Sequence, residues 1–331
     1  MDGGPRLLSF QELDARAAAY DGHVARTPGI DLFCSSTDWI LPARESFAPS
    51  AEPFIVETDA GFVSLMTVPT AEGARALAPL EPIWGLASPF VGPDPAPLAA
   101  ALFETLGQRG GVHALFLSGL AVGGDAAAAV ARFAGPRWRA IPGPEAGRQV
   151  ADLVGGVDGF YSRRSPHFRA NLRRERRMAA REGVTYEYHT RFPTPAEVSA
   201  TYQRIQDIER TSWKGIDGHG IDQGPAFEFY RQMLLRLAAR GALRVVFARL
   251  GDDDVAYVFG GLFRHTYRGL QCSFDDRWRR LSPGALVHME MIERLCDEGV
   301  AVYDLGSDME YKKRWGEDGL LTSATIVIRR R

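Results

Sequence analysis

The alternation of hydrophobic and polar residues is most regular in the last third of the chain. Residues 267–274 form a mainly apolar segment typical of a strand, and residues 300–305 form a second one. Between them, residues 285–298 have apolar positions at helical spacing and end before Gly299. The pattern predicts a strand, a helix and a strand, with the turn Ser282-Pro283-Gly284 at the start of the helix.

A tight turn that opens a helix directs unpaired backbone N–H groups toward an anion. Gly284 permits close approach of the backbone to a phosphate, and Arg279 and Arg280 add positive charge. The same residues also fit an ordinary helix cap, with Pro283 at the first helical position. The turn is therefore a candidate phosphate site or a simple cap.

Helices and strands alternate along the rest of the chain. Residues 53–58 and 61–68 predict a hairpin, residues 114–120 a buried strand, and residues 195–211 a helix. This order predicts a mixed α/β or α+β fold. The length of 331 residues suggests two domains, and the segment 140–157, rich in Gly and Pro, predicts a linker. We place the domains at 1–157 and 158–331.

The segment from Arg163 to Arg181 is strongly basic and is expected to be helical. Glu175 is its only acid, whereas its arginines are residues 163, 164, 169, 173, 174, 176, 177 and 181. Charge runs of this kind are usually solvated helix faces. Arginine forks also suit phosphate, so the helix is a candidate surface for CoA, transfer RNA or an anionic lipid or polymer.

Composition limits the possible functions. The chain is 45% hydrophobic and 24% charged, with a net charge of -2, so nucleic-acid binding requires a local basic patch. Three widely spaced cysteines favour a reducing compartment over a disulfide framework. No segment approaches the ~20 apolar residues of a membrane span. We expect a soluble, cytoplasmic protein, and the sequence does not indicate its oligomeric state.

Four motifs occur in order between about residues 160 and 316. They are Asn171-Leu172-Arg173-Arg174, Ser212-Trp213-Lys214-Gly215, Ser282-Pro283-Gly284, and Tyr303-Asp304-Leu305-Gly306 followed by Tyr311-Lys312. Together they resemble the CelD-like acyltransferases of the GNAT superfamily, relatives of the Fem-type peptidyltransferases. The resemblance implies two tandem GNAT-like domains, each a mixed sheet flanked by helices. It also implies acyl transfer from a thioester such as acyl-CoA to a small-molecule or peptide amine.

The turn departs from the usual phosphate loop of the superfamily, Arg/Gln-x-x-Gly-x-Gly/Ala. Arg279, Arg280, Gly284 and Ala285 keep its charge and small residues but not its full glycine pattern. This difference leaves room for a carrier other than CoA. With Ser282, these residues are the candidate donor site, and Lys312 is a candidate counter-charge for a donor phosphate.

Three residues are candidates for proton transfer. A base must take a proton from the acceptor ammonium before the amine attacks. The candidates are Asp275, at the end of a predicted strand, and Glu209, near the end of a helix. Tyr311 would protonate the leaving thiolate. The alternatives are a solvated loop acid for Asp275 and a surface pair with Lys214 for Glu209.

Four further residues are candidates for substrate binding. Trp213 would stack on a substrate, Lys214 would bind a carboxylate or phosphate, and His219 lies in a glycine-rich loop able to cover a site. Asp304 ends a predicted strand, where ligands gather in α/β sheets. The alternatives are a core tryptophan, a solvated loop histidine and a structural ion pair for Asp304.

The sequence contains no P-loop, no His-Glu-x-x-His, no Gly-x-Ser-x-Gly and no cysteine pairs at metal spacing. We therefore predict no metal and no covalent enzyme intermediate. The leading hypothesis is an N-acyltransferase that works by direct attack of an amine on a thioester. The alternatives are a transfer-RNA-dependent aminoacyl transferase of the Fem type and a non-catalytic, degenerate GNAT binding module.

Overall fold

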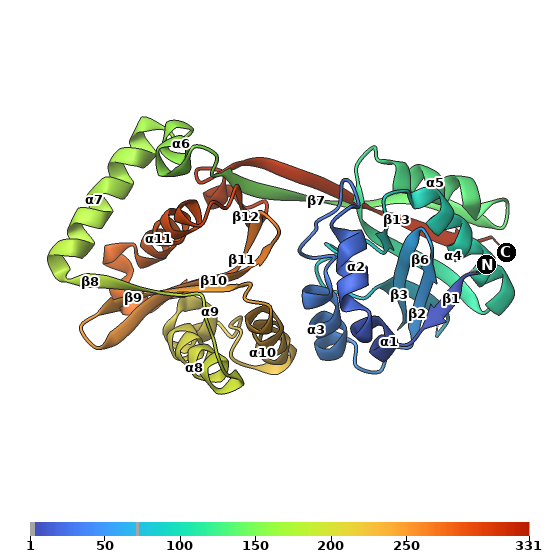
Figure 1. The fold of residues 1–331 in the computed structure, drawn as a ribbon, viewed down its shortest axis with the longest axis horizontal. Helices are drawn as coiled ribbons and strands as arrows, with labels where there is room; N and C mark the ends of the chain where they lie inside the picture. The colour runs from blue at the N-terminus through green and yellow to red at the C-terminus, as the bar shows by residue number, and fades with distance from the viewer. Residues whose placement is uncertain (1–3, 71–72, 331) are drawn as a thin grey trace. The chain divides into compact units, whose positions relative to one another are not determined.

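The computed structural model describes residues 4–70 and 73–330 of the chain (Figure 1). They form two compact units, Met1–Gly147 with Leu320–Arg331, and Arg148–Gly319. Most of the last strand of the chain therefore belongs to the first unit. The domain ranges 1–157 and 158–331 stay a prediction.

The first unit is a mixed sheet with helices on both faces. Its strand order is β1-β2-β3-β4-β6-β13, with β5 paired to β3. The strands are β1 (Arg6–Leu8), β2 (Pro53–Thr58), β3 (Gly61–Pro69), β4 (Arg75–Pro79), β5 (Phe90–Val91), β6 (Val112–Ala121) and β13 (Glu317–Arg329). The helices are α1 (Phe10–Ala15), α2 (Ala17–Val24), α3 (Thr37–Phe47), α4 (Pro95–Arg109) and α5 (Asp125–Ala134).

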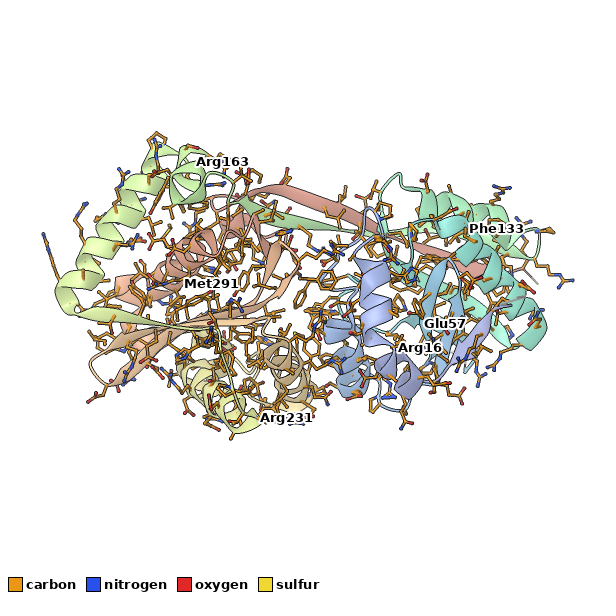
Figure 2. All side chains as sticks on the ribbon, viewed as in Figure 1. Arg16, Glu57, Phe133, Arg163, Arg231 and Met291 are labelled. Carbon is orange, nitrogen blue, oxygen red and sulfur yellow. The ribbon has the colours of Figure 1, made fainter. Side chains whose placement is uncertain are left out.

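Alternation along β3 explains why both faces of this sheet are covered. Val63 and Leu65 are buried in the core formed with α4 and α5. Phe62 points to the opposite face, where its ring lies 5.1 Å from that of Tyr20 in α2. Between α1 and α2, Arg16 forms an ion pair with Glu57 of β2 at 2.6 Å (Figure 2).

The second unit repeats this plan. Its strand order is β7-β12-β11-β10-β9-β8. The strands are β7 (Trp138–Asp152), β8 (Val184–His189), β9 (Leu243–Leu250), β10 (Asp253–Phe263), β11 (Thr266–Phe274) and β12 (Val302–Ser307). The helices are α6 (Gly156–Ser162), α7 (Pro166–Glu182), α8 (Pro195–Thr211), α9 (Trp213–Ile216), α10 (Gly224–Ala239), η1 (Asp276–Leu281), α11 (Pro283–Asp297) and η2 (Glu310–Lys312).

The two faces of this second sheet differ in what covers them (Figure 1). Val258 of β10 is buried in a core shared with α11, where Met291 also lies (Figure 2). Phe259, its neighbour, faces the other way and its ring lies 5.7 Å from that of Tyr230 in α10. One face is therefore covered by α11 and the other by α8 and α10.

The segment 140–157, predicted as a linker, contains the boundary between the two units at Gly147 and Arg148, but most of it forms the 15-residue strand β7 instead of an irregular connection. Gly143 shows why a glycine is needed inside this strand. A Cβ there would lie 2.9 Å from the Cβ of Ala324 in β13 and 3.1 Å from its carbonyl oxygen. The glycine permits close approach of two strands rather than a turn.

The α/β class is confirmed, and each unit contains the same central motif. In the first, β4 and β6 are parallel and joined through α4; in the second, β11 and β12 are parallel and joined through α11. A parallel pair requires such a crossover. Among residues 4–70 and 73–330, no helix combines the length and apolar character needed to cross a membrane.

Candidate functional site

The most distinctive feature of the second unit is the parting of its parallel strands β11 and β12. They pair only at Thr266 with Val302, Tyr267 with Tyr303, and Arg268 with Asp304. A bulge between Phe259 and Gly260 of β10 shifts the register of β11 at the same level. On the side of β12, residues 269–274 therefore have no strand partner in the described chain.

The predicted Ser282-Pro283-Gly284 turn lies beside this opening. Ser282 is left-handed (φ 53°), and its carbonyl oxygen accepts the N–H groups of Ala285 and Leu286 at 2.9 and 3.2 Å. Pro283 has no N–H, so the N–H of Gly284 is the one this turn leaves for a ligand. The turn offers an anion fewer donors than the sequence predicts.

Gly284 also has a packing role. A Cβ on this residue would lie 3.2 Å from the ring of Phe274 and 4.0 Å from Sγ of Cys272. The start of α11 thus lies directly against the open part of β11.

The two arginines predicted to bind donor phosphates are paired with acids. Arg279 contacts Asp276 at 2.6 Å, and Arg280 contacts Glu182 at 3.4 Å. Both side chains are largely exposed. Their positive charge is shared with these carboxylates, and surface pairs of this kind contribute little.

Glu209 lies at the end of α8 and is fully buried. Its Oε2 accepts a 2.7 Å hydrogen bond from the hydroxyl of Tyr257, whereas its Oε1 has no partner among the described residues. The glycine-rich loop after α9 covers it, since a Cβ at Gly220 would lie 3.2 Å from Cγ of Glu209. A buried carboxylate with a free oxygen is suited to accept a proton.

Lys214 joins α9 to the open strand. Its Nζ donates to Oε1 of Gln271 at 3.0 Å and to the carbonyl oxygen of Cys272 at 2.8 Å. Gln271 in turn donates to the hydroxyl of Tyr230 at 2.8 Å. The neighbouring Trp213 is 47% exposed, so it is a surface residue rather than part of the core.

Positive side chains gather where β12 ends. Arg268 contacts Asp304 at 2.6 Å, and the N–H of Gly306 donates to the other oxygen of Asp304 at 2.7 Å. Lys312 donates to the carbonyl oxygen of Ser307 at 3.1 Å. Burial and the nearby Arg268 lower the pKa of Lys312 to about 8, despite the opposing charge of Asp304.

Tyr311 of η2 lies close enough to Cys272 of β11 for Cys272 to influence the pKa of Tyr311. Burial raises the pKa of the Cys272 thiol to about 12, and Lys214 opposes this change. Desolvation and the nearby Cys272 raise the pKa of Tyr311. Both groups are therefore protonated at neutral pH, and Tyr311, which is 46% exposed, has a proton to donate.

Sequence reasoning missed His288 of α11. Its Nδ1 lies 2.8 Å from the hydroxyl of Tyr303 in β12. Burial, together with Lys312 and Lys214, lowers the pKa of His288 to about 4, so the ring is neutral at pH 7. The only sequence signal was its position four residues after Gly284, on the same helix face.

Other predicted residues lie apart from this constellation or have structural partners. Asp275 caps η1 and accepts from the backbone and side chain of Arg277 at 2.5–3.1 Å. Burial raises the pKa of this carboxyl, but the contacts of Arg277 outweigh burial and hold the pKa below its ordinary value. His219 is exposed in its loop. Arg268, Tyr257 and Gln271 were missed, because only the fold brings them to the opening.

The basic helix α7 divides its arginines between structural and exposed positions. Arg164, just before the helix, pairs with Glu317, and Arg176 within it pairs with Glu293. The opposite face carries Arg173, Arg174, Arg177 and Arg181, all exposed and within roughly a third of the helix circumference. Of these four, only Arg173 has a described contact, with the ring of Tyr161 at 6.0 Å.

Comparison with known proteins relates part of the second unit to one domain family. Residues 166–313 match the model of the acetyltransferase (GNAT) domain. A search of curated proteins gives no match.

Solved structures extend the likeness to the whole chain at the level of fold. A conserved protein of unknown function from Bacteroides thetaiotaomicron has a TM-score of 0.65 at 12% identity, covering 98% of this chain and 100% of the other. FemX has a TM-score of 0.65 at 11% identity, covering 98% and 97%. The C-terminal domain of a putative lysylphosphatidylglycerol synthetase from Agrobacterium fabrum has a TM-score of 0.56 at 14% identity, covering 92% and 91%.

These findings confirm the resemblance to the GNAT superfamily and its Fem-type relatives. Residues 166–313 of the second unit match the GNAT domain model, and the chain has the fold of two tandem GNAT-like domains. In the second domain, the candidate site is the opening between β11 and β12 with the side chains that border it.

Proposed function

We propose that the protein is an N-acyltransferase that holds a thioester donor, such as acyl-CoA, in the opening between β11 and β12. The observation that carries the proposal is the loss of pairing after Arg268 and Asp304. An acyl carbonyl placed there would meet the backbone N–H groups of β11, which can stabilise a developing oxyanion. The N–H of Gly284 would meet a donor phosphate at the start of α11.

In the proposed reaction, Glu209 takes a proton from the acceptor ammonium, and the free amine attacks the thioester carbonyl carbon. The new C–N bond gives a tetrahedral intermediate whose oxygen is held by the β11 backbone. Collapse of this intermediate breaks the C–S bond. Tyr311 donates a proton to the departing thiolate, and the nitrogen gives up its second proton to solvent, which also reprotonates Tyr311. The products are an amide and a free thiol.

Binding of the donor provides the direct test. Native mass spectrometry of the full chain with acetyl-CoA and longer acyl-CoAs should give a CoA-sized mass increase, and an added amine should convert the donor to free CoA. Absence of binding at every chain length would contradict a CoA thioester donor. It would favour a different acyl carrier or a non-catalytic binding module.

A second candidate function is transfer of an aminoacyl group carried by transfer RNA. The exposed face of α7 favours it, because four arginines lie together there with no acid among them. Arginine forks bind phosphates through paired hydrogen bonds. The names of the structural neighbours, FemX among them, describe those proteins only.

Salt dependence separates the two candidates. Binding of transfer RNA through α7 should weaken linearly with the logarithm of salt concentration. Replacing Arg173, Arg177 and Arg181 by Gln should reduce that slope by about one for each phosphate that the variant no longer binds. Binding that does not change in this variant would exclude α7 as the RNA surface.

A further inference from the structure

We infer that the α8–α10 face of the opening holds an oxyanion-binding site formed by Lys214, Arg268 and Lys312. This site would bind a carboxylate or phosphate group of the amine acceptor. The acceptor would therefore carry both an amine and an anionic group. The assignment to the acceptor rests on the proposed acyl transfer, whereas the existence of the anion site does not.

Gly306 locates the centre of this site. Its φ is +88°, and a Cβ at this position would lie 3.4 Å from Nζ of Lys312 and 3.6 Å from Nη2 of Arg268. Both cationic groups therefore border the same small space beside the backbone. Because glycine adds no side chain there, both cationic groups can lie this close to the backbone, where an anion would meet them together.

In the described chain, the two lysines of this site form no direct ion pair with a carboxylate. Asp304 pairs with Arg268, and the N–H of Gly306 binds the other oxygen of the same carboxylate. In the described chain, the hydrogen bonds of Lys312 and Lys214 all go to neutral oxygens. Buried or half-buried cations without counter-charges are costly, and such sites are often functional.

The lowered pKa of Lys312 agrees with this excess of positive charge. Besides burial and Arg268, the charges of Lys214 and Arg148 also lower it. Lys214 likewise contributes to lowering the pKa of His288. The two lysines, from α9 and η2, therefore lie close enough to act on the same groups, and one bound anion would stabilise both charged forms.

The position on the sheet distinguishes this site from the donor site. Arg268 is opposite Gly261 and Gln271 is opposite Phe259, which places both on the face covered by α8 and α10. The turn at Gly284 lies on the other face, against Phe274 and Cys272. A donor phosphate at the start of α11 would therefore not occupy the space beside Gly306. This assigns Lys312 to the acceptor, whereas the sequence predicts a role at the donor.

Inorganic phosphate is a suitable probe, because its binding does not depend on turnover. We expect calorimetry on the full chain to give at least tenfold weaker phosphate binding after Lys312→Met or Lys214→Met. The matched control is Lys313→Met, since Lys313 is exposed and pairs with Glu310 at 3.1 Å. Binding of acetyl-CoA should stay within twofold in all three variants.

Two results would overturn the inference. Phosphate binding that is unaffected by Lys312→Met and Lys214→Met would show that these cations do not form an anion site. Parallel loss of phosphate and acetyl-CoA binding would assign the cations to the donor instead.

Matched acceptors test the link to catalysis. With acetyl-CoA as donor, kcat/KM should be at least tenfold higher for β-alanine than for β-alaninamide, or for phosphoethanolamine than for ethanolamine. The preferred pair identifies the anion as carboxylate or phosphate, and Lys312→Met should abolish the preference. Equal rates within both pairs would contradict an anionic acceptor. A lack of any acyl transfer would count against the proposed function, while phosphate binding would still decide whether the anion site exists.

Discussion

The hydroxyl of Tyr257 donates a 2.7 Å hydrogen bond to one oxygen of Glu209, and the other oxygen of this carboxylate has no partner among the described residues. Tyr257 lies on β10, directly opposite Ser273 of the open strand β11. This pair thus connects a buried base to the strand that would hold the acyl carbonyl. It explains why we assign proton transfer to Glu209 rather than to Asp275, whose carboxylate is held by Arg277.

Replacing Glu209 by Gln should lower kcat/KM for acyl transfer by about 10²–10⁴-fold, because the acceptor ammonium loses its base. The amide keeps the shape of the side chain and still accepts from Tyr257. Acetyl-CoA binding should be unchanged. Release of free CoA, followed against pH, measures the effect.

Glu228→Gln is the matched control for this prediction. Glu228 is a glutamate on α10 that pairs with Arg231 on the surface, at 2.6 Å. Its replacement should leave the rate unchanged. A Glu209→Gln variant as active as this control would exclude Glu209 as the base.

Removing the hydroxyl of Tyr257 should destabilise the protein. In Tyr257→Phe the fully buried carboxylate of Glu209 loses its described hydrogen bond, and an unsatisfied buried group costs about 1–3 kcal/mol. Urea unfolding measures this loss. A Glu209→Gln background should reduce it, and an identical loss in both backgrounds would show that the two side chains are not coupled.

Bulk at Gly284 should destabilise the fold as well as block the donor. A side chain there meets the ring of Phe274, so Gly284→Val should cost about 1–3 kcal/mol through overpacking. The double variant Gly284→Val/Phe274→Ala relieves the contact. It should recover part of the lost stability but not acetyl-CoA binding, and recovery of both would show that Gly284 acts through packing alone.

The lowered pKa of Lys312 predicts a pH-dependent stability. Below pH 8, Lys312 is charged in both the folded and the unfolded state. Burying this charge beside Arg268 therefore destabilises the folded state to its full extent. Between pH 8 and about 10.4, the unfolded chain binds more protons than the folded one, so the free energy of unfolding rises with pH. Lys312→Met should therefore be more stable than the original protein at pH 7.

This gain should shrink as the pH rises from 8 toward about 10.4. Chemical unfolding at several pH values across this window measures the difference in unfolding free energy between the variant and the original protein. For the control Lys313→Met, the pH dependence of stability should equal that of the original protein. A stability difference between Lys312→Met and the original protein that does not vary with pH would show that Lys312 titrates normally in the folded state.

Local patterns predicted the elements that build the site. The apolar run before the turn corresponds to β11, and the helical pattern after it to α11. At β7, Pro142, Gly143 and Pro144 suggested a linker, and the segment does cross the boundary between the two units, but composition did not indicate that it is a strand. Gly143 serves a contact with β13, which lies almost two hundred residues away in the sequence, and no local signal reveals such a contact.

Prediction of the site was less complete for the same reason. The sequence predicted substrate, catalytic and donor roles for Lys214, Tyr311 and Lys312, and these roles stay predictions. In the structure Lys214 is bonded to the unpaired part of β11, and Lys312 lies beside Gly306. The sequence did not indicate a role for Arg268, because this residue lies in an apolar strand. Its role becomes visible only when the fold places it beside Asp304 and Gly306 of β12. Charge counting suggested that Arg279 and Arg280 were available for phosphate, but their acidic partners depend on local geometry.

The central claim is that a thioester donor binds where β11 and β12 part. Titration calorimetry of the full chain with acetyl-CoA tests this claim most directly. A second measurement adds an amine acceptor and follows the release of free thiol. The account predicts saturable binding and release of one CoA for each amide formed, with binding retained and release lost in Glu209→Gln. No binding of acetyl-CoA or of longer acyl-CoAs would contradict it.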